Sequence, residues 1–257
     1  MNPTFLRTNL AQGKAAASAL STQTCRVFPI FGEGTPQAGM ARGVARVARV
    51  ELAANGQCAP VTLGSEEQSW YVLGGEGSVN GKPLRKDDFA YIPAGARLEL
   101  SAGAAGMELL QQGYRLPKGR KGATELQIAS AGEVKLQVVG KHPPSTLYRL
   151  MIGGTNSTRD KMAAGGVLTS LFLMEMTPGG TNFPHNHDRE EEVYVLLEGE
   201  GLMVAGGGSD GVEGKFPAKA GDAYFYRLNT TVGFYNTGKS KARILAARSL
   251  YPFGEQP

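Results

Sequence analysis

The sequence predicts an all-β protein built from two similar domains in tandem. The chain has 257 residues, more than one modest core usually fills, which suits two domains of about 110 residues each. It contains 36 glycines and 14 prolines with short alternating apolar runs between them, a composition typical of many strands and turns. An internal repeat, described next, indicates that the two domains are copies of one another.

The repeat relates the two halves of the chain by a nearly constant shift. Moving residues 50–56 by 124 positions places them on residues 174–180, and the same shift places residues 73–77 on 197–201 without a gap. A shift of 134 then places residues 88–93 on 222–227. The ten extra residues match the glycine-rich segment 205–211, which we expect to form a hairpin loop.

Three parts of the chain follow from this repeat. We expect an N-terminal barrel over residues 1–120, a connecting segment over residues 121–165 and a C-terminal barrel over residues 166–257. The connecting segment holds a strand-like run at residues 133–139 and then Pro143 and Pro144. It is therefore expected to cross between the barrels with some strand of its own.

A candidate metal site lies in the second copy. His185 and His187 are separated by one residue, and Glu192 follows after four more. Two imidazoles and a carboxylate are a common ligand set for a catalytic divalent metal, because they hold the ion and leave coordination positions open. Residues two apart in a strand point to the same face, so both histidines can reach one ion. These three residues are the predicted metal ligands.

Glu192 reaches that face only if the chain turns after His187, because five residues is an odd step along a strand. The polar residues 188–190 suit such a turn, and the β-branched and aromatic residues 193–197 predict a strand. With Glu192 pointing inward, Tyr194 and Leu196 point inward as well. The alternative is an ordinary hairpin in which the histidines lie on a polar rim and the acidic run 190–192 is solvated.

These residues make the chain resemble the cupin superfamily. The first cupin motif, G-x5-H-x-H-x4-E-x6-G, is matched in full from Gly179 to Gly199. The resemblance implies a small antiparallel β-barrel of the jelly-roll type with the metal inside it. Together with the repeat, it implies a bicupin, a chain of two such barrels.

The second cupin motif, G-x5-P-x-G-x2-H-x3-N, is matched only in part. Gly221 and Asn236 stand at its two ends. Its proline, glycine and histidine are replaced by Arg227, Asn229 and Val232. The usual fourth protein ligand of the family is therefore absent, which leaves a three-ligand, facial-triad arrangement.

The two copies differ at the site itself. Through the repeat, the ligand positions and Val232 correspond in order to Val61, Leu63, Gln68 and Leu98. The first barrel thus keeps no ligand, and Trp70, the only tryptophan, falls opposite Tyr194 on the face toward the cavity. We expect Trp70 to be buried and to fill that barrel, so that the first copy is structural and the second functional. An apolar ligand bound in the first barrel without metal is the alternative.

The leading functional hypothesis is an enzyme whose divalent ion binds a small substrate at its open positions. Iron or manganese suits this ligand set best, and nickel, copper and zinc stay open. The resemblance implies dioxygenase, isomerase, lyase or decarboxylase chemistry, with a dioxygenase favoured, and it names no catalytic side chain. The predicted substrate contacts are Tyr194, Tyr226, Arg227 and Asn229. The alternative function is a non-catalytic cupin that binds or senses a small molecule.

The composition argues against some classes of partner and favours one cellular compartment. The net charge of +4 is small and dispersed, which argues against nucleic acid, and no segment has the apolar length of a membrane span. Cys25 and Cys58 do not make a disulfide framework and suit a reducing cytoplasm, and no signal peptide is recognisable. We therefore expect a cytoplasmic protein, and exposed sheet edges favour a homodimer.

The third histidine, His142, precedes Pro143 and Pro144 in the connecting segment. Its spacing gives no reason to place it at the metal site. We expect it to be a surface residue.

Overall fold

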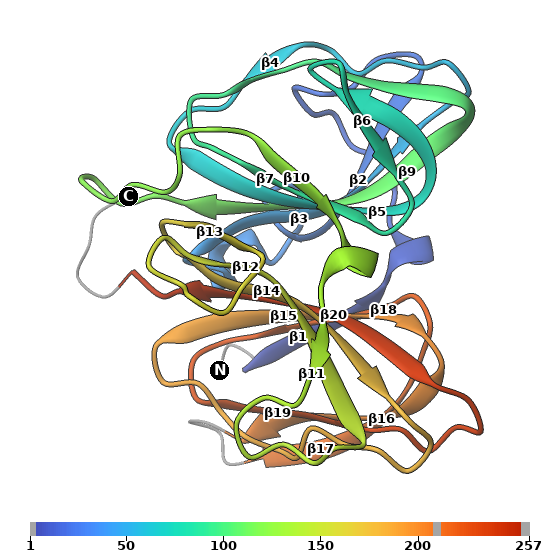
Figure 1. The fold of residues 1–257 in the computed structure, drawn as a ribbon, viewed down its shortest axis with the longest axis vertical. Helices are drawn as coiled ribbons and strands as arrows, with labels where there is room; N and C mark the ends of the chain where they lie inside the picture. Colours follow the sequence, from blue (N-terminus) through green and yellow to red (C-terminus); the bar gives the residue numbers. More distant parts are fainter. Residues whose placement is uncertain (1–3, 208–211, 253–257) are drawn as a thin grey trace.

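The all-β prediction is confirmed by a computed structural model, which describes residues 4–207 and 212–252. These residues form twenty strands and three short 3₁₀ turns, η1 (Leu10–Gln12), η2 (Ala38–Met40) and η3 (Ala131–Glu133). The strands gather into two barrel-like halves stacked along the long axis of the molecule (Figure 1). None of the described residues forms a helix long and apolar enough to cross a membrane.

The first half consists of a large sheet in the order β10-β7-β5-β9-β3-β2, with β6 paired to β5, and a small sheet of β4 and β8. The pairings that join these strands are antiparallel. Its strands are β2 (Cys25–Gly32), β3 (Val44–Leu52), β4 (Val61–Thr62), β5 (Glu66–Val79), β6 (Lys82–Arg85), β7 (Asp88–Ile92), β8 (Arg97–Leu98), β9 (Leu100–Arg115) and β10 (Gln127–Ser130).

The second half repeats this plan. Its large sheet has the order β1-β18-β15-β20-β14-β12-β11, with β13 paired to β12, and its small sheet has the order β17-β16-β19. Its strands are β1 (Phe5–Asn9), β11 (Leu136–Gln137), β12 (Thr146–Gly154), β13 (Met162–Gly165), β14 (Leu168–Met176), β15 (Glu190–Glu198), β16 (Glu200–Gly207), β17 (Val212–Lys219), β18 (Asp222–Tyr226), β19 (Thr230–Tyr235) and β20 (Ala242–Leu250).

Three hydrophobic cores lie in layers through the molecule. One fills the first barrel around Trp70, one fills the second barrel around Tyr194, and the central core between the two large sheets draws on both halves. Successive side chains of a strand point to opposite faces, so Tyr71 and Val195 enter the central core while their neighbours enter the barrels. Both large sheets are therefore buried on both faces.

Two strands are exchanged between the halves. β1 precedes the first half in sequence but pairs with β18 of the second, with Phe5 opposite Tyr226. β10 precedes the second half but pairs with β7 of the first, with Gln127 opposite Tyr91. Figure 1 shows the blue strand β1 in the lower half and the green strand β10 in the upper half. The division at residues 120 and 165 stays a prediction, and these two pairings cross it.

Two buried glutamates join the halves reciprocally. Glu67 of β5 accepts hydrogen bonds of 2.8 to 3.1 Å from the backbone N–H groups of residues 166–168. Glu191 of β15 accepts bonds of the same lengths from the N–H groups of residues 42–44. Both side chains are inaccessible to solvent. The shift of 124 residues relates the two acceptors and the two donor runs.

The prediction of unpaired cysteines is wrong. Cys25 and Cys58 form a disulfide with their Cα atoms 5.0 Å apart. Cys25 begins β2, which pairs with β3, and the chain after β3 folds back so that the Ala59 N–H bonds to the Leu20 carbonyl. This hairpin brings together residues 33 positions apart. The cytoplasmic location stays a prediction. Unpaired cysteines no longer support it, because disulfides persist mainly in oxidising compartments.

The first barrel is filled as expected. Trp70 is 1% exposed, and its indole N–H donates to the Gln68 side-chain oxygen at 2.8 Å. The Gln111 amide donates to the same oxygen at 2.9 Å. The polar group that replaces the ligand carboxylate is thus satisfied within the barrel. Of the predicted loop 205–211, residues 205–207 belong to β16, and the rest lies outside the described residues.

We expect Trp70→Ala to lower the free energy of unfolding by about 3–5 kcal/mol, the usual loss for a large buried aromatic side chain. Calorimetry would measure it, and metal bound in the second half should be retained. Trp70→Phe, which keeps most of the apolar volume, is the matched control and should lose less. A Trp70→Ala protein with the wild-type melting temperature would contradict this role.

Glu191→Ala leaves the backbone N–H groups of residues 42–44 without an acceptor, and the bonds of Gly43 and Val44 are buried. Because each unsatisfied buried donor costs about 1–3 kcal/mol, we expect the variant to lose about 2 kcal/mol or more of unfolding free energy in denaturant titrations. Glu67→Ala should behave alike by symmetry. The control is Glu99→Ala, which breaks only an exposed pair with Arg97 and should change stability by less than about 0.5 kcal/mol. Equal stability of Glu191→Ala and this control would be the contrary result.

Candidate metal centre

The predicted ligands sit on backbone that is held at both ends. His185 lies in the connection between β14 and β15 and forms a bridge with Val232 of β19, through hydrogen bonds of 2.9 and 2.8 Å. The His187 carbonyl accepts a bond of 2.8 Å from the backbone N–H of Asn229. Glu192 lies in β15 between its neighbours β18 and β20. The loop that carries the histidines is thus anchored to the barrel wall.

His185, His187 and Glu192 come together. Each residue offers one possible ligand atom, and these three atoms all lie within 4.8 Å of one another. The Nε2 atom of His187 is 3.3 Å from a Glu192 carboxylate oxygen. Bends at residues 188 and 189 precede β15, so the expected turn is present, and residues 193–197 form a strand as predicted.

A hydrogen bond orients the His185 ring, and a carboxylate lies behind the His187 ring. The Nδ1 atom of His185 is 2.8 Å from the Phe183 carbonyl oxygen, so Nδ1 carries the proton and Nε2 keeps its lone pair. The Nδ1 atom of His187 lies 3.7 Å from the Glu190 carboxylate. A ring fixed by a carbonyl or carboxylate behind it is the arrangement that supports metal binding.

The polar atoms of the site fit a bound ion. His187 Nε2 and both carboxylate oxygens of Glu192 are buried and have no hydrogen-bond partner. Three more buried atoms around the same cavity also lack a hydrogen-bond partner, namely the hydroxyl oxygens of Tyr148 and Ser170 and Nε of Arg248. Buried polar atoms without partners are uncommon, and a cation beside the nitrogen and the two oxygens would satisfy them.

These groups line a cavity of about 280 Å³ in the second barrel. Its lining includes the three ligands and Tyr194, with contributions from β12, β14 and β20. The sequence analysis did not identify the other lining residues, which are Val139, His142, Tyr148, Leu150, Arg159, Ser170, Phe172, Asn182 and Arg248. Most stand at inward positions of strands that the repeat could have aligned, but their side-chain types form no motif.

The predicted substrate contacts separate into one that lines this cavity and three that do not. Tyr194 lines it, and its hydroxyl accepts a bond of 3.0 Å from the Asn182 amide. Tyr226 is 1% exposed and packs inside the barrel against Tyr194. Arg227 and Asn229 follow β18 and are absent from the lining. Asn229 is exposed, with a positive φ of 58°, and supports His187 through its backbone.

His142 corrects the sequence interpretation. It is half-buried and lines the cavity, with its ring centre 5.5 Å from that of His185, so the expectation of a surface residue is wrong. The loop between β11 and β12 folds over the second barrel, and sequence spacing carries no signal of that contact. Burial lowers the pKa of the His142 imidazole, and the neighbouring His185 lowers it further.

Two phenols of the cavity stay neutral. Burial raises the pKa of the Tyr148 and Tyr194 hydroxyls, and the nearby Glu192 raises both further. Near neutral pH both groups therefore carry their protons and can donate a hydrogen bond to a bound molecule.

The first half has the same backbone arrangement at the corresponding positions but none of the ligand side chains. Val61 of β4 pairs with Leu98 of β8, as His185 pairs with Val232. The backbone bridge is thus kept while both side chains are apolar. This pairing agrees with the alignment that places Val232 where the second cupin motif has its histidine.

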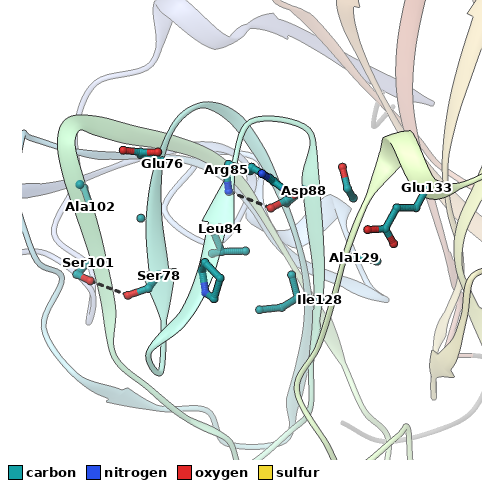
Figure 2. Close-up of a pocket in the computed structure, with 14 residues that line it drawn as sticks. Glu76, Ser78, Leu84, Arg85, Asp88, Ser101, Ala102, Ile128, Ala129 and Glu133 are labelled. Atoms are coloured by element: carbon teal, nitrogen blue, oxygen red, sulfur yellow. Dashed lines mark hydrogen bonds between the residues drawn. The ribbon is translucent and has the colours of Figure 1, made fainter.

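A larger hollow of about 610 Å³ lies on the first half, along β5, β6, β9 and β10 (Figure 2). Some of its polar groups bond to one another. The hydroxyls of Ser78 and Ser101 are 3.0 Å apart, and Asp88 accepts a bond of 3.0 Å from the Arg85 backbone. None of its lining residues holds a buried polar atom without a partner. The smaller cavity is therefore the better candidate for a functional site.

Comparison with known proteins agrees with this fold. Residues 172–248 match the cupin domain. They span the predicted ligands and most of the strands around the cavity. A search of curated protein sequences found no match.

Several solved structures share the fold over nearly the whole chain. A protein of Pseudomonas aeruginosa described as glyoxylate-induced is 16% identical, with a TM-score of 0.77 over 97% of this chain and 90% of its own. Oxalate decarboxylase from Lactobacillus farciminis, in a formate complex, is 12% identical, with a TM-score of 0.70 over 96% and 86%. Oxalate decarboxylase from Bacillus subtilis, studied for its Mn(II) centres, is 12% identical, with a TM-score of 0.72 over 95% and 77%. At these identities the likeness concerns the fold alone.

We expect the purified protein to bind about one divalent metal ion per chain, as a single site of this ligand set should. Elemental analysis would measure the content. His185→Ala removes one of the ligands and should lose the ion, whereas Asn229→Ala leaves the ligand side chains and the Asn229 backbone N–H in place and should keep it. Full metal content in His185→Ala would refute the assignment.

Proposed function

We propose that this chain is a bicupin enzyme that uses a divalent metal ion in its C-terminal barrel to transform a small, negatively charged molecule. His185, His187 and Glu192 hold the ion, and iron or manganese suits them best. Such an ion polarises a bound carboxylate or carbonyl group and, when redox-active, supports reactions with dioxygen. The N-terminal barrel is the structural partner, since Gln68 and Trp70 stand in the place of a site.

The observation that carries the proposal is the set of buried polar atoms without hydrogen-bond partners at His187 and Glu192, beside a cavity of the second barrel. A purely structural barrel has no use for them, because each unsatisfied buried group lowers stability. The first barrel holds a fully hydrogen-bonded Gln68 at the same position. The contrast favours a ligand-binding role for the second barrel only.

The charges around the cavity favour an anion. Arg159 and Arg248 line it together with Glu192, and the arginines lie near Asp160 and Glu190 respectively. With neutral histidines, the two arginines and three carboxylates have a net charge of −1. A divalent ion changes this net charge to +1. A small monoanion then fits both the charge and the volume of about 280 Å³.

Two reaction classes are consistent with this site. A dioxygenase is the favoured one from the motif, and a decarboxylase is suggested by the oxalate decarboxylases that share the fold. In either case Tyr194 and Tyr148 are placed to donate hydrogen bonds to the substrate, and Arg248 to bind its charge. Phe172 and Leu150 supply apolar wall that limits water in the cavity. The non-catalytic alternative uses the same groups for binding alone.

The test is to load the untagged protein with Mn(II) or Fe(II) and to measure dioxygen uptake and carbon dioxide release with small carboxylates, including oxalate and glyoxylate. We expect turnover of at least one anion and none of its neutral amide, and we expect His185→Ala to abolish it. Saturable binding of an anion without turnover would establish the non-catalytic alternative. Equal binding of an acid and its amide would contradict the anionic substrate class.

A further inference from the structure

We propose that His142 is the fourth protein ligand of the metal ion, supplied by the loop between the barrels in place of the histidine that Val232 replaces. The inference rests on the proposed metal centre and adds to it a residue outside both cupin motifs. The resulting set of three imidazoles and one carboxylate has the composition that a complete pair of cupin motifs would provide.

The first argument is distance. The ring centres of His185 and His187 are 5.0 Å apart, and those of His142 and His185 are 5.5 Å apart. Two imidazoles on one ion, with nitrogen to metal bonds of about 2.0–2.1 Å, have ring centres about 4.5–5.5 Å apart. His142 therefore lies beside the group that the other three residues form, although its ring nitrogens are not part of that group. Its side chain must turn toward the ion to bind it.

The second argument is that its loop is tied to the segment that leads to His185. The Thr146 hydroxyl donates to the Thr181 carbonyl at 2.7 Å and is fully buried. The Thr177 N–H donates to the Ser145 carbonyl at 3.1 Å. Pro143 and Pro144 restrict the chain between these bonds and His142. The position of His142 is thus fixed relative to the site before any ion binds.

The third argument is the orientation of the ring. The His142 imidazole donates a hydrogen bond to the Asn182 backbone carbonyl. The bond leaves the second ring nitrogen with its lone pair, as the Phe183 carbonyl does for His185. A backbone carbonyl behind each ring is the support that metal-binding histidines usually have.

The fourth argument is that no other described side chain of the lining fills this role. Val232 is 1% exposed and apolar, and its backbone is occupied by the bridge to His185. Beyond the predicted ligands, His142 is the only imidazole or carboxylate that lines the cavity. Packing against Tyr148, at 5.4 Å between ring centres, is compatible with both a structural and a ligand role, so the test must count ligands.

The deciding experiment is electron paramagnetic resonance of Cu(II) bound to the untagged wild-type protein near neutral pH, with and without ¹⁵N in the histidine rings. We expect superhyperfine splitting from three imidazole nitrogens. The chain contains three histidines in all, so a count of three requires His142. A count of two overturns the inference and leaves the proposed metal centre intact. Absence of Cu(II) and Mn(II) binding, or binding unchanged in His185→Ala, overturns both.

Mn(II) titration calorimetry gives an independent readout. His142→Ala should bind Mn(II) at least about 10- to 100-fold more weakly, the scale seen when groups that support a metal site are lost. Arg159→Ala, which alters the same cavity without removing a ligand type, is the matched control and should not weaken binding. The double variant His142→Ala and Val232→His should recover both affinity and three nitrogens. Wild-type affinity in His142→Ala would overturn the inference.

Discussion

Two carboxylates buried between the halves constrain the rest of the structure. Glu67 and Glu191 are inaccessible to solvent and take their hydrogen bonds from backbone N–H groups of the opposite half. Each glutamate precedes the residue at the ligand position, Gln68 or Glu192, and adjacent strand residues face opposite ways. Anchoring Glu191 to the first half therefore fixes Glu192 toward the cavity. The interface between the barrels and the orientation of the predicted metal ligand Glu192 are set by one pair of neighbouring residues.

The two barrels share one backbone arrangement but differ in whether their inner polar groups are hydrogen-bonded. In the first barrel, Gln68, Trp70 and Gln111 bond to one another and leave no polar atom of that group unpaired. In the second, polar atoms of His187 and Glu192 are left without partners in a cavity. One copy is built for stability and the other keeps unsatisfied groups, which is the usual condition of a functional site. The interface lets the first barrel support the second.

Much of the site could be predicted because it depends on local rules. Strand alternation places Glu192 and Tyr194 on one face, and the turn after His187 follows from polar residues. What could not be predicted depends on how distant segments fold back. His142 and the bond between Cys25 and Cys58 depend on loop closure, which leaves no periodicity in the sequence. Tyr226 shows a further limit, since an inward position in a barrel is usually core and only sometimes cavity.

β1 and β10 pair with strands far from them in sequence, and this exchange bears on the history of the chain. Two identical barrels related by a two-fold axis, each lending its leading strand to the other, would form a symmetric homodimer with this pairing. Joining two such genes would yield the present chain, with the dimer interface already inside it. A fused pair, unlike a homodimer, can lose the ligands of one copy without losing those of the other. Such a fusion would make asymmetry at the site possible.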